Sequence, residues 1–311
     1  MRKPRVLRPG DRIAVIAPAS PFARETFDAG LSELRLLGFA PVFDDSVFDR
    51  RSYVAGTAAS RAAAFRQAWT DPSVAGIIAV RGGYGSVQML PLLDPRDFAG
   101  TAKAFVGYSD TTSLLTWLNQ ACGVVAFHGP MLEGRLARGE AGYDRDTFRR
   151  CLCRTAPAGE IGHPRLETLR PGEATGVLAG GTLTKLAASL GTPYAFAPPD
   201  GAILFLEDVA ERPYRLDRML TQLRLARVFD RAAAVVFGTM PGCDEPGGMP
   251  AARDVILDLF DGFTGPVLFG LPSGHADGPA LTLPFGVHTR LVADASPRLI
   301  VEEAAVVDSL E

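Results

Sequence analysis

A serine lies in a very short connection between a predicted strand and a predicted helix. The segment Gly107-Tyr-Ser109-Asp-Thr111 follows an apolar run and leads directly into a helical pattern. A serine on so tight a turn points its hydroxyl outward at a helix N-terminus, where the dipole and the free N–H groups favour a developing anion. The G-x-S part of a nucleophile elbow is present, but Thr111 replaces its final glycine. Ser109 is therefore a candidate nucleophile, and the alternative is that Ser109 or Asp110 only caps the helix.

A glycine-rich segment follows an earlier predicted strand, over residues 74–80. In Arg81-Gly-Gly-Tyr-Gly-Ser86, three glycines in four positions allow a sharp turn with bare N–H groups. Such a turn could form an oxyanion hole, a phosphate nest or only a connection. It does not match G-x-G-x-x-G, which disfavours a nicotinamide enzyme. Arg81 could bind a substrate carboxylate through a bidentate pair. A surface ion pair is the alternative, because only three of the 32 basic residues are lysine and a single arginine is weak evidence.

Two later strand ends carry an acid and a base. Glu207 and Asp208 end a very apolar run, where a carboxylate must be paired or lie in a cleft because an isolated buried charge is costly. His275 lies in a glycine-bounded loop between two predicted strands, which suits a general base better than a strand interior does. Of the other histidines, His128 follows an apolar strand, His163 lies in the predicted linker, and His288 is expected to be exposed on a strand.

Ser109, Glu207 and His275 together form a candidate catalytic triad. A serine hydroxyl needs a base, and the imidazole needs a carboxylate to fix its tautomer. The chain order of serine, acid and histidine is one of several that such enzymes use. Spacing alone does not bring the three residues together, and Asp208 remains the rival acid.

The elements that must position these residues alternate in the first half of the chain. Short apolar runs predict strands at 12–18, 41–44, 74–80, 104–108 and 124–127, and helical spacing predicts helices at 27–37, 58–69 and 111–119. This repeated β-α-β order predicts an α/β fold with a parallel sheet covered by helices on both faces. Sites in such sheets collect at the carboxyl ends of the strands, which is where Ser109 and the glycine-rich segment lie.

The pattern changes after residue 150. The segment 154–176 is rich in proline and glycine, and we interpret it as a linker with room for one strand. Beyond it we predict strands at 202–206, 233–237, 267–269, 280–283, 287–292 and 299–302, and one clear helix at 214–227. The expected organisation is an N-terminal α/β domain over 1–153 and a smaller, mixed, strand-rich C-terminal domain over 177–311, as a length of 311 residues also suggests.

Composition and charge exclude several classes of protein. With 47% hydrophobic and 22% charged residues the chain is globular rather than disordered. A net charge of −3 gives no broad basic face for nucleic acid or an anionic membrane. No apolar stretch approaches the ~18 residues of a membrane helix, and the run 13–17 is too short for a signal peptide, so we expect a cytoplasmic protein. Four cysteines without paired spacing predict reduced structural thiols.

Eight short motifs resemble those of the LD-carboxypeptidases, a family of serine peptidases. They are Gly10-Asp-Arg-Ile-Ala-Val-Ile-Ala-Pro18-Ala-Ser-Pro21, Arg81-Gly-Gly-Tyr-Gly85, Gly107-Tyr-Ser-Asp110, Ala126-Phe-His-Gly-Pro130, Gly180-Gly-Thr-Leu183, Leu190-Gly-Thr-Pro193, Glu207-Asp208 and Gly274-His275. Each is short, but their shared order over about residues 10–290 makes the match specific. The resemblance implies two domains with the active site between them, no metal or cofactor, and a homodimer.

The resemblance also implies roles for individual residues. It makes Ser109 the nucleophile, with Glu207 and His275 completing the triad. The oxyanion hole would consist of backbone N–H groups from the glycine turn and from the residue after the nucleophile (Gly82, Gly83 and Asp110). The side chains of the same glycine turn would bind the substrate (Arg81 and Tyr84).

The substrate implied by the resemblance is a bond between an L-centre and a terminal D-amino acid. In the type case, D-alanine is released from the murein tetrapeptide during cell-wall recycling in the cytoplasm. A second branch resembles microcin-immunity peptidases, which cleave a peptidyl or aminoacyl group from a nucleotide-like toxin. The turn at Arg81 favours the first branch, which must hold a free terminal carboxylate. A degenerate member would instead be a non-catalytic peptide-binding protein, with the glycine turn as an anion nest.

Overall fold

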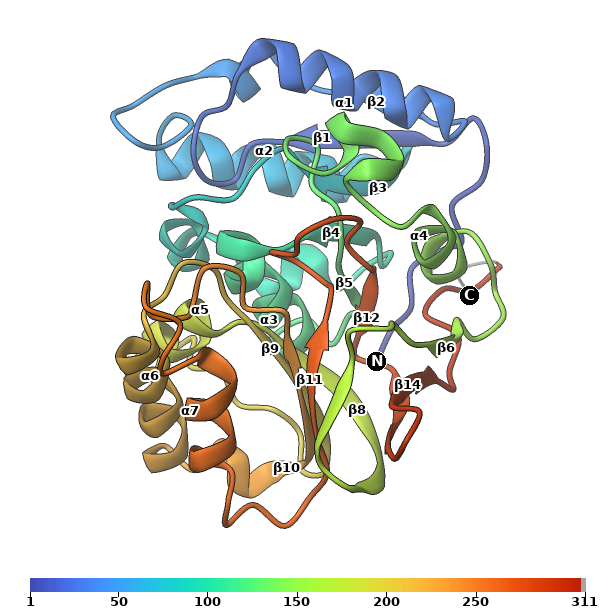
Figure 1. Ribbon diagram of the computed structural model, residues 1–311. Helices are drawn as coiled ribbons and strands as arrows, with labels where there is room; N and C mark the ends of the chain where they lie inside the picture. Colours follow the sequence, from blue (N-terminus) through green and yellow to red (C-terminus); the bar gives the residue numbers. More distant parts are fainter. Residues whose placement is uncertain (309–311) are drawn as a thin grey trace.

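The computed structural model describes residues 1–308 and arranges their strands in two sheets (Figure 1). The first sheet has the order β12-β5-β4-β3-β1-β2, and the second has the order β6-β14-β13-β8-β9-β10-β11-β7. Over this range, each sheet contains a run of parallel strands together with antiparallel pairs, one in the first sheet and four in the second. The predicted fold class, a parallel α/β part followed by a mixed, strand-rich part, is confirmed.

Five parallel strands of the first sheet come from the first half of the chain. They are β1 (Arg12–Ile16), β2 (Ala40–Val42), β3 (Val74–Ala79), β4 (Ala104–Gly107) and β5 (Ala126–His128). The connecting helices are α1 (Arg24–Leu36), α2 (Ala58–Thr70) and α3 (Thr112–Gln120), followed by α4 (Arg145–Leu152). In Figure 1, α1 and α2 lie on opposite sides of β1, so the strand is covered on both faces. This explains why its sequence is a continuous apolar run without alternation.

The second sheet is built on four parallel strands. These are β8 (Gly172–Thr182), β9 (Ala202–Glu207), β10 (Ala232–Gly238) and β11 (Val267–Leu271). Antiparallel strands extend both edges: β7 (Glu167–Arg170) beside β11, and β13 (His288–Ala293), β14 (Arg298–Val301) and β6 (Gly159–Ile161) beyond β8. Three helices pack on this sheet: α5 (Leu183–Ser189), α6 (Pro213–Leu225) and α7 (Ala252–Leu259).

Two expectations about the second half were wrong. The segment 154–176, expected as a linker with room for one strand, contains two whole strands, β6 and β7, and the first part of β8. Both β6 and β7 are edge strands of three or four residues, and every residue of β7 is partly exposed, so neither has an apolar signal. The strand expected at 280–283 shares only Leu283 with the observed strand β12 (Leu283–Phe285), which pairs with β5 and thus joins the first sheet. Helices α4, α5 and α7 were not predicted, because each has only seven or eight residues.

The core between the two sheets is continuous with that of the first sheet. On β9, Ile203 and Phe205 belong to this shared core, whereas Leu204 and Leu206 pack with α5, α6 and α7 on the other face. Side chains alternate between the faces of a strand, so the last residue, Glu207, points toward the first sheet. The packing therefore directs a carboxylate into the region where the two sheets meet.

Candidate active site

Ser109 occupies a strained turn at the carboxyl end of β4. The strand ends at Gly107, and a 3-10 turn (Ser109–Thr111) continues directly into α3. The φ angle of Ser109 is +61°, in the left-handed region that non-glycine residues seldom adopt. Strain of this kind persists where the surrounding structure enforces it, commonly at functional sites. The tight connection expected from the sequence is therefore present.

The glycine-rich segment lies directly against this turn. A Cβ atom added to Gly82 would lie 2.9 Å from the Cβ and 3.0 Å from the Oγ of Ser109, and 3.4 Å from the amide nitrogen of Asp110. Only glycine allows this close approach. Within residues 1–308, the N–H groups of Gly82 and Gly83 donate no hydrogen bond to another residue. The segment thus brings free backbone donors close to the serine hydroxyl.

Asp110 connects the serine turn to its surroundings. Its buried carboxylate accepts a hydrogen bond from the Ser86 N–H through Oδ2 at 2.8 Å. Oδ1 lies 2.8 Å from Nζ of Lys185, which belongs to α5 on the second sheet. The same ammonium lies 5.5 Å from the ring centroid of Tyr84. Lys185 was not among the residues proposed from the sequence, since nothing in its local pattern marks it.

Glu207 and His275 form a hydrogen-bonded pair. One carboxylate oxygen of Glu207, Oε2, accepts hydrogen bonds from the backbone N–H of His275 at 2.9 Å and from its Nδ1 at 2.8 Å. The other oxygen accepts a hydrogen bond from the Thr182 hydroxyl, on the neighbouring strand β8. The pair can form because Glu207 ends β9 and His275 follows β11, while Gly238 at the end of the intervening β10 has no side chain.

The contact between Glu207 and His275 shifts the pKa of both residues. Burial by itself would raise the pKa of Glu207, but the charge and hydrogen bond of His275, aided by His128 and Thr182, lower this pKa to about 2. For His275, burial lowers the pKa, but the charge and hydrogen bond of Glu207 outweigh it, and the net pKa is raised above its ordinary value. Because Nδ1–H donates to Glu207, Nε2 is the nitrogen left to accept a proton. The pair is suited to a base that becomes an imidazolium.

Asp208 makes a different set of contacts. Its Oδ2 accepts from the Thr184 N–H at 2.8 Å and from the Thr184 hydroxyl at 2.6 Å, and its Oδ1 accepts from the Val209 N–H at 2.9 Å. Burial raises the pKa of Asp208 to about 6. These bonds direct the side chain toward the first turn of α5, away from the face on which Glu207 lies.

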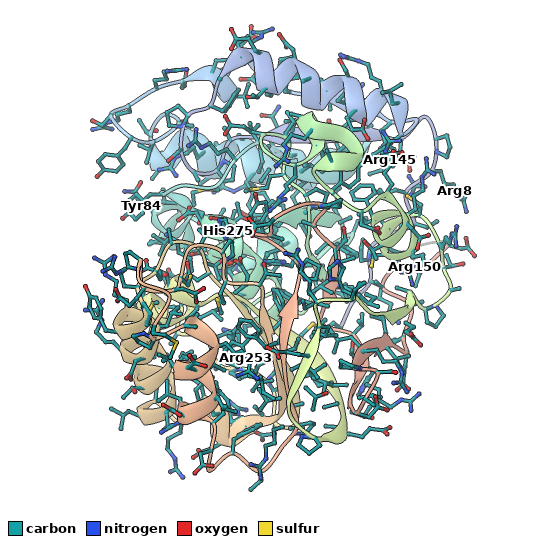
Figure 2. The ribbon with its side chains drawn as sticks, viewed as in Figure 1. Arg8, Tyr84, Arg145, Arg150, Arg253 and His275 are labelled. Carbon is teal, nitrogen blue, oxygen red and sulfur yellow. The ribbon has the colours of Figure 1, made fainter. Side chains whose placement is uncertain are left out.

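Ser109 lies next to the pair without being bonded to it. Within the described residues, no hydrogen bond joins the Ser109 hydroxyl to His275. The preceding residue, Tyr108, packs edge-to-face on the His275 ring, with centroids 5.1 Å apart. Figure 2 shows His275 at the level where the upper, N-terminal part of the molecule meets the lower part, with Tyr84 at the same level. The structure therefore joins two members of the candidate triad and brings the turn of the third beside them.

His128 is part of this region although the sequence did not single it out as a site residue. It is fully buried at the end of β5, with Nδ1 at 3.0 Å from the Ser273 hydroxyl and Nε2 at 3.9 Å from Oε1 of Glu207. Burial lowers the pKa of His128 to about 4, so the ring is neutral near pH 7. Gly274, with φ of +72°, allows this packing, since a Cβ there would lie within 2.8 Å of both side chains. The signal was the strand-end position in Phe127-His-Gly-Pro130.

Arg81 forms an ion pair. Its Nε lies 3.2 Å from Oε2 of Glu133, and its Nη1 donates to the Pro21 carbonyl at 3.2 Å. Its side chain is 46% exposed, and Tyr84 is also exposed, with its ring 5.8 Å from that of Tyr53. A ligand carboxylate would therefore have to compete with Glu133 for Arg81.

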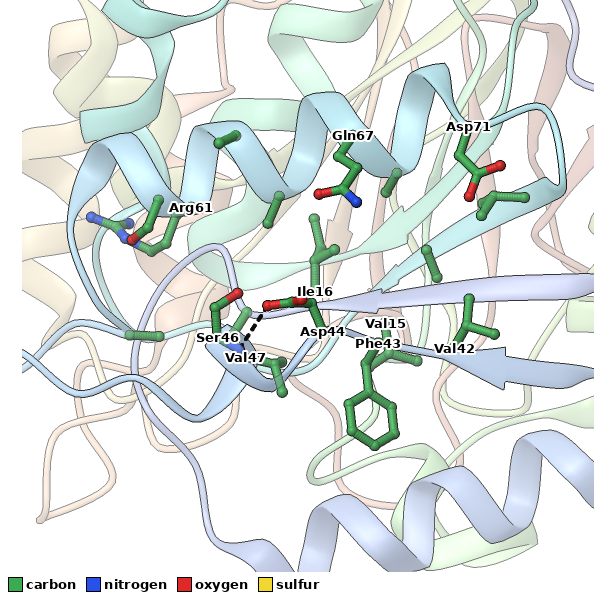
Figure 3. Close-up of a pocket in the computed structure, with 18 of the residues that line it drawn as sticks. Val15, Ile16, Val42, Phe43, Asp44, Ser46, Val47, Arg61, Gln67 and Asp71 are labelled. Carbon is green, nitrogen blue, oxygen red and sulfur yellow. Dashed lines mark hydrogen bonds between the residues drawn. The ribbon is translucent and has the colours of Figure 1, made fainter.

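A pocket of about 450 Å³ lies between α2 and the strands β1 and β2 (Figure 3). No triad residue lines it, but its lining includes Arg61, whose guanidinium donates to the carbonyl groups of Pro18 and Gly85.

Within residues 1–308 there is no group of three His, Cys, Asp or Glu side chains able to hold a metal ion, and no helix long and apolar enough to cross a membrane. The four cysteines form no disulfide, and burial raises the pKa of Cys151 to about 12.

Comparison with known proteins gives concordant matches over both halves of the chain. Residues 13–129 match the model of the LD-carboxypeptidase N-terminal domain, and residues 175–291 match that of the C-terminal domain. A putative carboxypeptidase of Streptomyces coelicolor is 41% identical over 94% of each chain. A probable murein peptide carboxypeptidase of Bacillus subtilis is 31% identical over 98% of this chain and 95% of its own. The structure of the Escherichia coli microcin C7 self-immunity protein MccF in complex with glutamyl sulfamoyl guanosine is similar, with a TM-score of 0.89 and 25% identity over 98% of this chain and 99% of that one.

Proposed function

The chain belongs to the LD-carboxypeptidase family, and we propose that it is a serine carboxypeptidase that releases a terminal D-amino acid from an L-centre. The substrate proposed is the murein tetrapeptide, with D-alanine as the product. The observation that carries the proposal is the buried Glu207–His275 pair beside the strained turn of Ser109. The name of the Bacillus subtilis relative, a murein peptide carboxypeptidase, supports the substrate class.

The proposed reaction is acyl transfer in two steps. Ser109 Oγ attacks the scissile carbonyl while its proton passes to Nε2 of His275, and the carboxylate of Glu207 stabilises the imidazolium that forms. The proton then passes to the leaving amine, and the D-amino acid departs. Water, deprotonated by His275, then attacks the acyl-enzyme; the bond between the acyl carbon and Ser109 Oγ breaks, and the imidazolium returns the proton to Oγ as the acid product leaves. The raised pKa of His275 supports this role, because it reflects the stabilised imidazolium.

Backbone donors are proposed to stabilise the oxyanion of the tetrahedral intermediate. The candidates are the N–H groups of Gly82, Gly83 and Asp110. Support comes from the close approach of Gly82 to the Ser109 side chain and to the amide nitrogen of Asp110. Donors aimed at a developing charge are worth about 10² to 10³ in rate each.

Arg81 and Tyr84 are proposed to bind the peptide, with Arg81 receiving its terminal carboxylate. Binding would exchange the carboxylate of Glu133 for that of the substrate. A bidentate guanidinium–carboxylate pair is strong enough to fix the orientation of a short peptide. Exposure of both side chains near the serine turn is the structural support.

The setting of the reaction is also a proposal. Recycling of wall fragments takes place in the cytoplasm, and we propose that the protein acts there as a homodimer, without metal or cofactor. The chemistry above needs no group beyond the side chains and backbone already named. The domain assignment that accompanies it gives Ser109 to an N-terminal domain and Glu207 with His275 to a C-terminal domain.

Two other functions remain to be separated by experiment. The likeness to MccF, whose solved complex holds a sulfamoyl nucleotide, favours an aminoacyl- or peptidyl-nucleotide as the second candidate substrate. A non-catalytic peptide-binding protein is the third.

Incubation of the purified protein with murein tetrapeptide and, separately, with an aminoacyl-nucleotide analogue tests the proposal. We expect D-alanine from the first and an acyl adduct on Ser109 by mass spectrometry. Ser109→Ala should lower kcat by about 10⁶ while leaving the fold intact, as in other serine triads. Turnover near that of the wild type in this variant would contradict the assignment of the nucleophile. Tight peptide binding with neither turnover nor adduct would indicate the binding protein.

A further inference from the structure

The loop that carries His275 has no helix or strand, yet its carbonyl groups are fully engaged. All five successive carbonyls of residues 274–278 accept a hydrogen bond from a side chain. Thr239 binds the His275 carbonyl at 3.3 Å, and Arg165 binds the Asp277 carbonyl at 2.9 Å. The other three belong to one side chain, Arg135, whose guanidinium donates at 2.6, 3.0 and 2.8 Å to the carbonyls of Gly274, Ala276 and Gly278. One arginine therefore fixes the backbone on both sides of His275.

Arg135 reaches this loop from the other sheet. It lies between β5 and a 3-10 segment (Leu136–Ala141). The preceding backbone is attached to the end of β3, because the N–H groups of Leu132 and Glu133 donate to the carbonyls of Ala79 and Val80. The Arg135 guanidinium also lies 5.8 Å from the ring centroid of Tyr108, in the turn that carries Ser109. A single side chain thus touches both the serine turn and the histidine loop.

The electrostatic cost of this arrangement argues for a role beyond stability. Arg135 is only 5% exposed, and within residues 1–308 it forms no ion pair with a carboxylate. An arginine cannot lose its charge under ordinary conditions, and a buried charge is costly unless its donors are satisfied. Here four carbonyls, including that of Gly142 at 3.2 Å, satisfy it. Apolar residues usually stabilise a core at least as well as a buried charge does. A planar fork that binds several carbonyls in fixed directions is what positioning a loop requires.

We propose that Arg135 is the positioning residue that holds the His275 loop at its distance from Ser109 across the boundary between the two sheets. This inference rests on the proposed function, since it assigns His275 the role of base. Arg135 touches no reacting atom in this scheme. It acts through the backbone of residues 274–278, and its loss should therefore affect the chemical step more than peptide binding.

Arg135→Lys is the first test, because lysine keeps the charge but replaces the planar fork, whose two Nη atoms reach the three carbonyls in fixed directions, with a single nitrogen. We expect kcat for murein tetrapeptide to fall about 10²-fold, the effect of a misplacement of about 1 Å, with KM within about threefold of the wild type. Amide hydrogen exchange in a peptide spanning 272–282 should accelerate. Arg165→Lys is the matched control, since Arg165 binds one carbonyl of the same loop from an exposed position; its kcat should stay within about threefold of the wild type.

Chemical rescue separates positioning from a general loss of structure. In Arg135→Ala, added guanidinium ion should restore part of kcat by occupying the vacated site, whereas urea at the same concentration should not. A merely destabilised protein would lose activity with either additive. If Arg135→Ala does not fold, Arg135→Gln replaces it, and the same fall in kcat with unchanged KM is expected. If Arg135→Lys, Arg135→Ala and Arg135→Gln all failed to fold, Arg135 would be a residue needed for stability, and the proposal would be overturned.

The outcomes distinguish this inference from the proposed function. If the wild type cleaves none of the candidate substrates and a fluorophosphonate does not label Ser109, the proposed function fails, and exchange at 272–282 still tests the attachment of the loop. If the wild type is active, a folded Arg135→Lys variant with kcat within about threefold of the wild type overturns the positioning role. Unchanged exchange in the loop would overturn it as well.

Discussion

Replacing Glu207 by glutamine would test the electrostatics of the site with little change in its shape. The amide oxygen can take the place of Oε2 and accept from both the backbone N–H and Nδ1–H of His275. The amide NH₂ can take the place of Oε1 and donate to the Thr182 hydroxyl. The substitution therefore removes a charge and keeps the hydrogen bonds that orient the imidazole.

The size of the effect follows from the geometry of the pair. When His275 takes the serine proton, a positive ring lies beside a fully buried carboxylate, with Nδ1 at 2.8 Å from Oε2. For charge centres about 4 Å apart and an effective dielectric constant of about 20, the attraction is about 4 kcal/mol. Its loss corresponds to about a 10³-fold fall in kcat. KM should change little, because a buried Glu207 does not contact the peptide.

The pH dependence gives a second, independent readout. His275 must be neutral to act as a base, so wild-type kcat/KM falls as the pH drops through the raised pKa of His275. Without the carboxylate, the imidazolium loses its partner and this pKa falls. The acidic limb of the Glu207→Gln profile should therefore move to lower pH. If the substitution acted only by distorting the site, kcat would fall but the acidic limb of the pH profile would not move.

The assay is release of D-alanine from murein tetrapeptide across the range in which histidine titrates, with thermal unfolding as the check on folding. Asp208→Asn is the matched control, because Asp208 binds Thr184 and Val209 instead of His275. Its kcat should remain within about threefold of the wild type. An inactive Asp208→Asn together with an active Glu207→Gln would mean that the wrong carboxylate has been chosen. Retention of more than about a tenth of kcat by a folded Glu207→Gln would refute the charge argument.

Two further predictions concern the glycine turn. Gly82→Ala should lower kcat at least about 10²-fold, because its Cβ would displace the Ser109 side chain by contacts of 2.9 and 3.0 Å; Gly100→Ala, whose Cβ meets nothing within 4 Å, should leave steady-state kinetics unchanged. Arg81→Gln should raise KM for the tetrapeptide at least about tenfold with little change in kcat, as loss of uniform binding does, whereas Glu133→Gln should lower KM by freeing Arg81. Equal KM values in all three proteins would remove Arg81 from the substrate site.

The serine turn and the strands that frame it could be predicted from the sequence because their signals are local. A strand buried on both faces requires a continuous apolar run, and the immediate change to helical spacing after Gly107 leaves no room for a loop. The predicted strand 104–108 and helix 111–119 therefore agree with β4 and α3 within about one residue. The left-handed φ of Ser109 follows from the same shortage of residues.

The choice between Glu207 and Asp208 needed knowledge of which face of β9 meets the first sheet. Both carboxylates end the same apolar run, and both faces of the strand are buried, so hydrophobicity does not distinguish them. Once Ile203 and Phe205 are known to face the first sheet, alternation assigns Glu207 to that side. The apolar pattern predicted where the strand ends to within one residue, and the resemblance indicated Glu207, but the physical reason that separates the two acids lies in the tertiary packing.

Arg135 illustrates what sequence reasoning could not find. Its partners are backbone carbonyls about 140 residues away, and carbonyls have no residue type for a motif to detect. In a chain whose basic residues are almost all arginine, one more arginine also carries little information. His128 differs, because it was visible at a strand end, but its proximity to Glu207 depends on how the two sheets pack.

Within the described residues, no hydrogen bond joins Ser109 to His275. This is also the contact of the proposed triad that crosses between the two sheets. Glu207 and His275 both belong to the second sheet and hold each other, whereas Ser109 belongs to the first. The Ser109–His275 separation is therefore set by contacts that span the boundary. They include the packing of Tyr108 on His275, the ion pair of Asp110 with Lys185, the bond from Thr182 N–H to the Thr112 hydroxyl, and the three bonds of Arg135 to the carbonyls of residues 274–278. In the proposed mechanism the peptide binds between the sheets and contacts both of them. Substrate binding and the packing of the boundary would then act on the same distance, and the proposed proton transfer from Ser109 to His275 would depend on both.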